Sequence, residues 1–217
     1  MENNSYKTLY QGGTGEIVEK KSRFIATTIG IESEEEAIKF INGLKKQYWD
    51  ASHNCFAYTA GKNHELQRCS DDGEPNGTAG RPMLEILLRE DIHNMAVVVT
   101  RYFGGTLLGT GGLVRAYQKA VQAGILQSII IERKQALDLM IHTDYQGLGK
   151  IQYLTAKHQI ETIDSDYTDK VKIHVMAPLN QAAVFQADII EGTNGTAVIE
   201  ELQTVEYAKV EDKIIIF

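Results

Sequence analysis

A glycine-rich segment in the middle of the chain constrains the fold more than any other feature of the sequence. Residues 104–112, GGTLLGTGG, contain five glycines. They follow Met95–Thr100, a β-branched run without polar alternation, which predicts a central strand covered on both faces. A helical pattern comes next, over 111–126, so we expect a strand, a turn that uses the conformational freedom of glycine, and a helix. Such a turn exposes backbone N–H groups at the positive end of the helix, where anions bind.

The spacing of these glycines excludes the common nucleotide-binding motifs. A Walker A loop needs Gly-Lys-Ser/Thr, which follows neither Gly105 nor Gly109, and a dinucleotide fingerprint needs a third glycine where Val114 stands. Two interpretations stay open, since the glycines either bind an anion or only let the helix pack closely on the sheet. The cations that flank the segment are Arg101, Arg115 and Lys119.

The rest of the N-terminal half alternates extended and helical patterns. Ser33-Glu34-Glu35-Glu36 is a capping box, which predicts a helix over 33–48, and Pro82 fits the first turn of a second helix that ends near Glu90. Residues 70–80 predict a loop, because they include three glycines, one proline and three acids. The extended segments are 6–11 and 16–29, expected to form a hairpin around Gly12–Gly15, and 53–60 and 65–70, expected to pair around the turn 61–64.

The C-terminal half follows the order strand, helix, strand, strand, helix, strand. This is the βαββαβ order of ferredoxin-like domains. Apolar and polar residues alternate over 171–176, so one face of this sheet should pack on the helices and the other should face solvent or a partner. We therefore expect an α+β protein with two domains, 1–134 and 135–217, in close contact. The strands are expected at 136–143, 159–165, 170–177 and 195–206, and the helices at 145–157 and 180–190.

The net charge of −7 is concentrated in the C-terminal part of the chain. Residues 1–130 carry 14 Lys and Arg against 15 Asp and Glu, whereas residues 131–217 carry 8 against 14. Broad polyanion binding requires a dense basic surface, because the affinity comes from released counterions. The composition therefore argues against a general nucleic-acid-binding protein and predicts no DNA specificity, and any RNA contact must be local.

The sequence has the features of a cytoplasmic protein. Its longest apolar runs are far shorter than a membrane span, and the N-terminal sequence MENNSYKTLYQ lacks the apolar core of a secretory signal. The two cysteines, Cys55 and Cys69, are therefore expected to be reduced thiols. We expect no membrane partner.

Two long motifs carry a family resemblance. The sequences SDDGEPNGTAGRP at 70–82 and RYFGGTLLGTGG at 101–112 resemble the signature of the YigZ/Impact family, and KKSRFIA at 20–26 and ASHNCFAY at 51–58 are similar to its earlier segments. The resemblance spans essentially the whole chain. It implies an N-terminal Impact domain like the second domain of ribosomal small-subunit protein five and the fourth domain of elongation factor G. It also implies a C-terminal half like the fifth domain of that factor, in agreement with the βαββαβ pattern.

The resemblance also implies a connection with translation. Eukaryotic Impact proteins regulate translation during amino-acid starvation by competing for the activator of the kinase that phosphorylates initiation factor two. Bacteria lack this kinase pathway, so only a looser role in translation or RNA contact carries over to the bacterial members that this chain resembles. The hypothesis is a regulatory protein that binds RNA or a ribosome-bound, translation-related partner through the glycine and arginine surface of its N-terminal domain. The residues expected to contact RNA or another anion are Lys21, Arg23, Arg81, Arg101, Gly104, Gly105, Thr110, Gly111, Arg115 and Lys119.

Two other classes of function stay open. The loop at 70–80 is a candidate docking site for a basic protein partner. Its acidic part, residues 70–74, together with His53 is a candidate hydrolase or transferase centre, although a solvated turn is the simpler interpretation of the acids. The loop residues expected to contact a partner are Ser70, Asp71, Asp72, Glu74 and Thr78.

No catalytic residue, metal or cofactor is assigned from the sequence. His53 and Cys55 are about 7 Å apart along a strand, too far for direct proton transfer, so we expect a packed cysteine beside a hydrogen-bonded histidine. Two cysteines cannot form a zinc ribbon. The histidines without recognisable ligand spacing are His64, His93, His142, His158 and His174.

Overall fold

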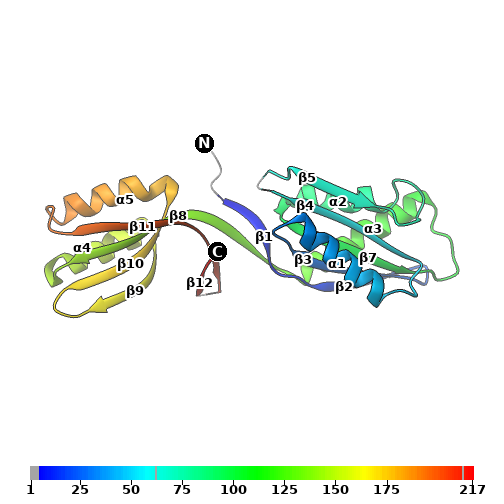
Figure 1. Cartoon of the computed structure of the whole chain (residues 1–217), viewed down its shortest axis with the longest axis horizontal. Helices are drawn as coiled ribbons and strands as arrows, with labels where there is room; N and C mark the ends of the chain where they lie inside the picture. The colour runs from blue at the N-terminus through cyan, green and yellow to red at the C-terminus, as the bar shows by residue number, and fades with distance from the viewer. Residues whose placement is uncertain (1–4, 62, 212) are drawn as a thin grey trace. The chain divides into compact units, whose positions relative to one another are not determined.

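The computed structural model describes residues 5–61, 63–211 and 213–217. The chain forms two compact units, residues 6–131 and residues 132–217 together with Ser5, and each is described by itself (Figure 1). The division falls inside one long strand, β8 (Ile129–Thr143), so no linker sequence marks it. Residues 1–4 of the expected first domain and Lys62 of the expected turn 61–64 lie outside the described residues.

The N-terminal unit is built on a five-stranded sheet in which every pair of neighbouring strands is antiparallel. Strand β7 is its centre, as its β-branched sequence predicts, and residues 95–101 of this strand are all buried. The strands, in sheet order, are β2 (Thr14–Glu19), β3 (Ser22–Gly30), β7 (Met95–Tyr102), β4 (His53–Ala60) and β5 (Leu66–Ser70).

Helices cover both faces of this sheet (Figure 1). On one face, α2 (Gly80–Glu90) and α3 (Thr110–Leu126) pack against Val97 and Val99. On the other face, α1 (Glu34–Gln47) packs against Ala96 and Val98. Successive side chains of a strand point to opposite faces, so residues 95–99 of β7 contribute alternately to two cores and are all apolar.

The capping box of α1 is confirmed, with one difference in its bonding. The Ser33 hydroxyl accepts the backbone N–H of Glu36 at 3.3 Å, and the Glu36 carboxylate accepts the N–H of Glu32 at 2.8 Å rather than that of Ser33. Both bonds satisfy N–H groups that the start of a helix leaves without intrahelical partners. Among the described helices, none is both long and apolar enough to cross a membrane.

The expected hairpin around Gly12–Gly15 is wrong. Strand β1 (Ser5–Gln11) pairs in parallel with β6 (Ile92–His93), and the hairpin joins β2 to β3 through Lys20 and Lys21, whose φ angles are 45° and 69°. The glycines serve close packing instead of a turn. A Cβ at Gly12 would lie 2.0 Å from the carbonyl oxygen of Thr28, so only glycine allows this approach.

The C-terminal unit has the ferredoxin-like strand order that the βαββαβ pattern predicts. Its helices α4 (Tyr145–Lys157) and α5 (Leu179–Gly192) form one core with the apolar face of an antiparallel sheet. Strand β12 (Lys213–Ile216), which extends the sheet beside β11, was not expected from the sequence. The strand order is β9 (Glu161–Tyr167), β10 (Val171–Pro178), β8 and β11 (Val198–Val210). The predicted α+β class with two domains is confirmed.

Candidate functional site

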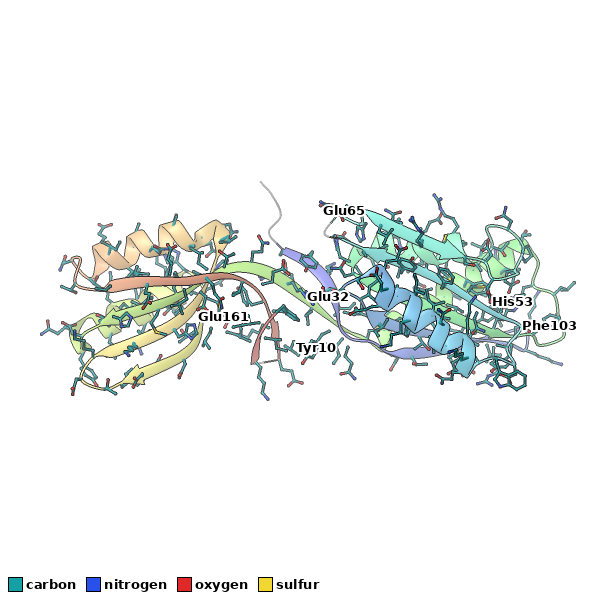
Figure 2. All side chains as sticks on the ribbon, viewed as in Figure 1. Tyr10, Glu32, His53, Glu65, Phe103 and Glu161 are labelled. Atoms are coloured by element: carbon teal, nitrogen blue, oxygen red, sulfur yellow. The ribbon has the colours of Figure 1, made fainter. Side chains whose placement is uncertain are left out.

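A pocket of about 530 Å³ lies in the N-terminal unit, at the end of β7 where the glycine-rich segment begins. The two long sequence motifs meet there, since Gly73, Glu74 and Pro75 form one side and residues 107–110 form the other. His53 and Phe103 lie at this same end of the unit in Figure 2. The remaining lining residues are Ser52, Arg101 and Leu113.

A buried ion pair forms the base of this pocket. Arg101 and Glu74 are only 5% and 8% exposed, and Arg101 Nη1 donates to Glu74 Oε1 at 2.5 Å. The Tyr117 hydroxyl, from α3, donates to the same oxygen at 2.8 Å. Charges this deeply buried need such partners, because leaving water costs several kcal/mol for each ion. Arg101 therefore holds the acidic loop to the central strand, and its charge is committed to Glu74 rather than offered to a phosphate.

Cys55 and Tyr117 are held in their protonated forms beside this pair. Cys55 Sγ lies 2.9 Å from the carbonyl oxygen of Asp71 and 3.3 Å from Tyr117 Oη. Burial raises the pKa of the Cys55 thiol to about 12 and moves the pKa of Tyr117 upward as well. A thiol in this state is a poor nucleophile, so Cys55 is a packing residue.

His53 is a further polar residue of the pocket. Its Nδ1 lies 2.9 Å from the carbonyl oxygen of Asp72, which only accepts, so Nδ1 carries the hydrogen. Its Nε2 is 3.9 Å from Glu74 Oε1. In the described part of the chain, no hydroxyl or thiol hydrogen-bonds to His53, and a hydrolase needs such a nucleophile beside its base. The geometry gives the hydrolase hypothesis no support.

The loop at 70–80 is fastened internally by the side chains that the sequence assigns to a partner. The carboxylate of Asp71 accepts the N–H groups of Gly77, Ala79 and Gly80 at 2.8–3.0 Å, which caps the start of α2. Asp72 accepts from Lys45 Nζ at 2.6 Å and from the backbone N–H of Asn54 at 2.7 Å.

The two hydroxyl groups of this loop are also used internally. The Ser70 hydroxyl accepts the N–H of Asp72 at 3.2 Å, and the buried Thr78 hydroxyl donates to the carbonyl of Pro75 at 2.6 Å. The solvated acidic turn expected from composition is instead a closely bonded scaffold.

The cap made by Asp71 predicts a specific loss of stability in acid. Burial raises the pKa of Asp71, but the bonds from Gly77, Gly80 and Ala79 outweigh it, so the folded-state pKa lies below the ordinary value. The stabilisation is therefore complete above the unfolded pKa of about 4 and disappears as the pH falls through the folded-state pKa. Asp71→Asn should cost about 1 kcal/mol at pH 7 in urea unfolding, and the difference from wild type should shrink in acid.

Glu90→Gln is the matched control, because Glu90 is an exposed acid at the other end of α2. It should leave the acid dependence unchanged. An Asp71→Asn variant that is as stable as wild type at pH 7 would contradict the capping role.

The glycines of residues 104–112 lie in different surroundings. Gly104 is a packing glycine, since its N–H donates to the Ser22 hydroxyl at 3.1 Å and an added Cβ would lie 2.1 Å from the backbone of Lys21. Gly109 is the N-cap of α3, with a φ of 72° and no side-chain cap. In the described ranges, no acceptor is found for the first-turn N–H groups of residues 110–112. The start of α3 is therefore open.

The predicted cations divide into two groups. Lys21, Arg115 and Lys119 are exposed, and an added Cβ at Gly111 would lie 3.5 Å from Arg115 Nη1, so this guanidinium lies beside the open start of α3. Arg23 and Arg81 are also exposed, but Arg23 pairs with Glu16 at 2.8 Å and Arg81 pairs with Glu85 at 3.4 Å. None of these five cations is among the residues that line the pocket.

Sequence reasoning missed the apolar rim of the pocket and the role of Tyr117. Phe103, directly before the glycine-rich segment, and Leu107, within it, are 49% and 82% exposed. The helical pattern over 111–126 predicts no hydrogen-bonding role for Tyr117. A tyrosine on the buried face of a helix indicates that a polar partner lies nearby, because its hydroxyl needs a buried hydrogen-bond partner.

Comparison with known proteins places this arrangement in a family. The Impact N-terminal domain matches residues 20–125, and a domain of unknown function, DUF1949, matches residues 141–196. IMPACT family member YvyE of Bacillus subtilis is 41% identical over 198 residues, which is 91% of each chain. The chain belongs to the IMPACT family. The resemblance carried by the sequence motifs is confirmed.

Other IMPACT proteins extend the comparison. IMPACT family member YigZ of Escherichia coli is 36% identical, over 82% of this chain and 88% of its own. A solved structure titled "Crystal structure of an hypothetical protein" is 32% identical, with a TM-score of 0.59 over 92% of this chain and 98% of its own. Protein IMPACT of Danio rerio is 37% identical over 98 residues, which cover 43% of this chain and 30% of that protein.

Proposed function

We propose that this IMPACT family member is a translation-associated regulatory protein that contacts single-stranded RNA at the open start of α3. The observation that carries the proposal is the uncapped first turn of this helix with the guanidinium of Arg115 beside it. Backbone N–H groups at a helix N-terminus and a neighbouring cation together favour a phosphate. The family resemblance supports the link to translation, and the proposal assigns this action to the cytoplasm.

The apolar rim supports RNA rather than an isolated phosphate as the ligand. Phe103 exposes about half of its surface next to the pocket and offers a face on which a base can stack. Stacking on aromatic side chains is the usual way in which proteins hold unpaired bases. A phosphate at the start of α3 and a base on Phe103 would together select a single strand.

The charge of the chain limits this contact to a small footprint. Three exposed cations that are not ion-paired in the structure belong to the predicted set: Lys21, Arg115 and Lys119. With three phosphate contacts, the logarithm of the affinity should fall with the logarithm of the salt concentration with a slope of about −2. Titration of a fluorescent single-stranded RNA at several salt concentrations measures this slope.

Arg115→Ala is the variant that tests the site itself. It should weaken RNA binding about tenfold and make the salt slope shallower by about 0.7. Arg89→Ala is the matched control, because Arg89 is an exposed arginine in the last turn of α2 and does not line the pocket. No RNA binding at low salt, or equal effects of the two substitutions, would refute the proposal.

A protein ligand at the same edge is the second candidate, favoured by the 82% exposure of Leu107. A leucine side chain packs well against an apolar protein surface but contributes little to RNA binding. Nuclease treatment of a pull-down from lysate separates the two functions. If the partners remain after nuclease treatment and are lost in the Leu107→Ser variant, the ligand of this edge is a protein rather than RNA.

A further inference from the structure

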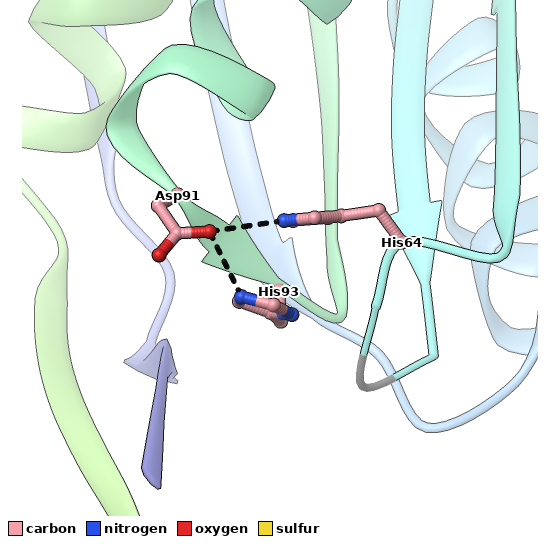
Figure 3. Close-up of side chains that lie close together, drawn as sticks. All are labelled: His64, Asp91 and His93. Carbon is pink, nitrogen blue, oxygen red and sulfur yellow. Dashed lines mark hydrogen bonds and ion pairs between the residues drawn. The ribbon is translucent and has the colours of Figure 1, made fainter. Parts of the chain in front are cut away.

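Three side chains from separate segments converge at the opposite end of β7 from the pocket. His64 belongs to the turn between β4 and β5, Asp91 is the C-cap of α2, and His93 lies in the short strand β6 (Figure 3). One donor atom from each of the three lies within 4.8 Å of the other two. None of these residues contributes to the pocket or to the proposed RNA contact.

The separations in this cluster are those of ligands around one metal ion. Both imidazole Nε2 atoms face Asp91 Oδ1, at 3.3 Å for His64 and 3.1 Å for His93 (Figure 3). Charge-assisted hydrogen bonds are usually shorter, at about 2.7–2.9 Å. Ligands with bonds of about 2.0–2.1 Å to a tetrahedral metal lie about 3.3 Å apart, and the two nitrogen–oxygen distances are close to that spacing.

The two imidazoles lie side by side in the cluster. Their rings stack with centroids 3.9 Å apart, and in the described residues neither buried Nδ1 has a hydrogen-bond partner. An imidazole coordinates a metal through one ring nitrogen, and both Nε2 atoms face Asp91, so these two nitrogens are the candidate ligand atoms.

Asp91 supplies an oxygen ligand beside the two imidazole nitrogens. Its side chain is 67% exposed, so its carboxylate is open to solvent while both histidines are mostly covered. The cluster therefore offers two nitrogens and one carboxylate oxygen, with one side open.

We propose that His64, Asp91 and His93 bind one divalent transition-metal ion of the zinc type, with a solvent molecule as the fourth ligand. Two imidazoles and a carboxylate suit zinc, cobalt and nickel better than calcium or magnesium, which prefer oxygen ligands. The ion connects residues 64 and 91, which lie 27 positions apart in the chain, one in the turn between β4 and β5 and the other at the end of α2. Its effect is to stabilise this end of the sheet.

Two single substitutions test the site without disturbing the backbone. His64 and Asp91 both have a φ of 54°, a left-handed conformation that asparagine tolerates well. His64→Asn and Asp91→Asn should therefore preserve the backbone conformation at both positions. His142→Asn is the matched control, because His142 also faces a carboxylate, that of Glu200 at 3.4 Å, in the C-terminal unit. All four proteins are prepared as the full chain without a histidine tag.

Co²⁺ and Zn²⁺ serve as the probes. Wild type and His142→Asn should bind one Co²⁺ per chain with the visible spectrum of four-coordinate cobalt, and Zn²⁺ should displace it. Both should also melt at higher temperature as Zn²⁺ is added. Each test substitution should weaken binding at least tenfold and remove most of the Zn²⁺-dependent rise in melting temperature. No binding by wild type, or binding that survives both test substitutions, would overturn the proposal.

Discussion

Arg101→Gln is expected to destabilise the N-terminal unit by about 3–5 kcal/mol, the cost of leaving a buried carboxylate without its cation. Glu74 is 8% exposed and accepts from both Arg101 and Tyr117, so the neutral amide removes its only charged partner among these contacts. Urea unfolding followed by circular dichroism measures the loss. A loss of this size would show that the role of Arg101 is to stabilise the fold.

Two further variants show whether the buried charge is the cause. Arg23→Gln removes an exposed arginine from its pair with Glu16, 2.8 Å away, and should have no measurable effect. The double variant Glu74→Gln with Arg101→Gln should regain part of the stability, because neither charge is then left alone. Equal stability losses for Arg101→Gln and Arg23→Gln would contradict this explanation.

Gly104→Ala is expected to destabilise the same unit by about 3 kcal/mol, at the upper end of the usual cost of overpacking. The added methyl group would lie 2.1 Å from the backbone carbon of Lys21 and 2.4 Å from the backbone nitrogen of Ser22. Backbone atoms in a tight turn between two paired strands cannot move aside as a flexible side chain does. Thermal unfolding should show a clear fall in melting temperature.

Gly111→Ala, seven residues further on, should have the opposite effect. Its nearest contact would be Arg115 Nη1 at 3.5 Å, an ordinary van der Waals distance, and position 111 lies in the first turn of α3. Alanine is the better helix former by about 1 kcal/mol, so this variant should be as stable as wild type or more so. If both alanine variants lose similar stability, the assignment of different roles to the two glycines is wrong.

These stability experiments also determine how the RNA proposal is tested. A loss of binding in Arg101→Ala would report damage to the fold as much as a lost contact, since Arg101 is 5% exposed. Arg115 is exposed on the first turns of α3 and gives a clean test. Of the two arginines that flank the glycine segment, only Arg115 is therefore informative about the ligand.

Much of the fold was predictable from local patterns. The capping box at Ser33, the buried run of β7 and the strand and helix order of the C-terminal unit are each decided by neighbours in the sequence. Hydrophobic periodicity and helix capping act over a few residues, so one sequence is enough to read them. The parallel pairing of β1 with β6 was missed because Lys7 and Ile92 lie far apart in the chain.

The candidate site was predictable only as a region. Both motifs that line the pocket were recognised, but the pairing of Glu74 with Arg101 was not, and the acids at 71 and 72 were expected to be exposed. Whether a charged residue faces solvent or a buried partner depends on elements brought together by the fold. The composition of a loop carries no information about that.

By itself, the sequence determined the family, the two-domain α+β class and the secondary structure on each side of the glycine segment. Only the tertiary structure decided that Arg101 is buried, that the start of α3 is open, and that His64, Asp91 and His93 meet. The physical reason is the range of the interactions. Periodicity, capping and turn chemistry act between near neighbours, whereas ion pairs, pockets and ligand clusters join segments that only the folded chain brings into contact.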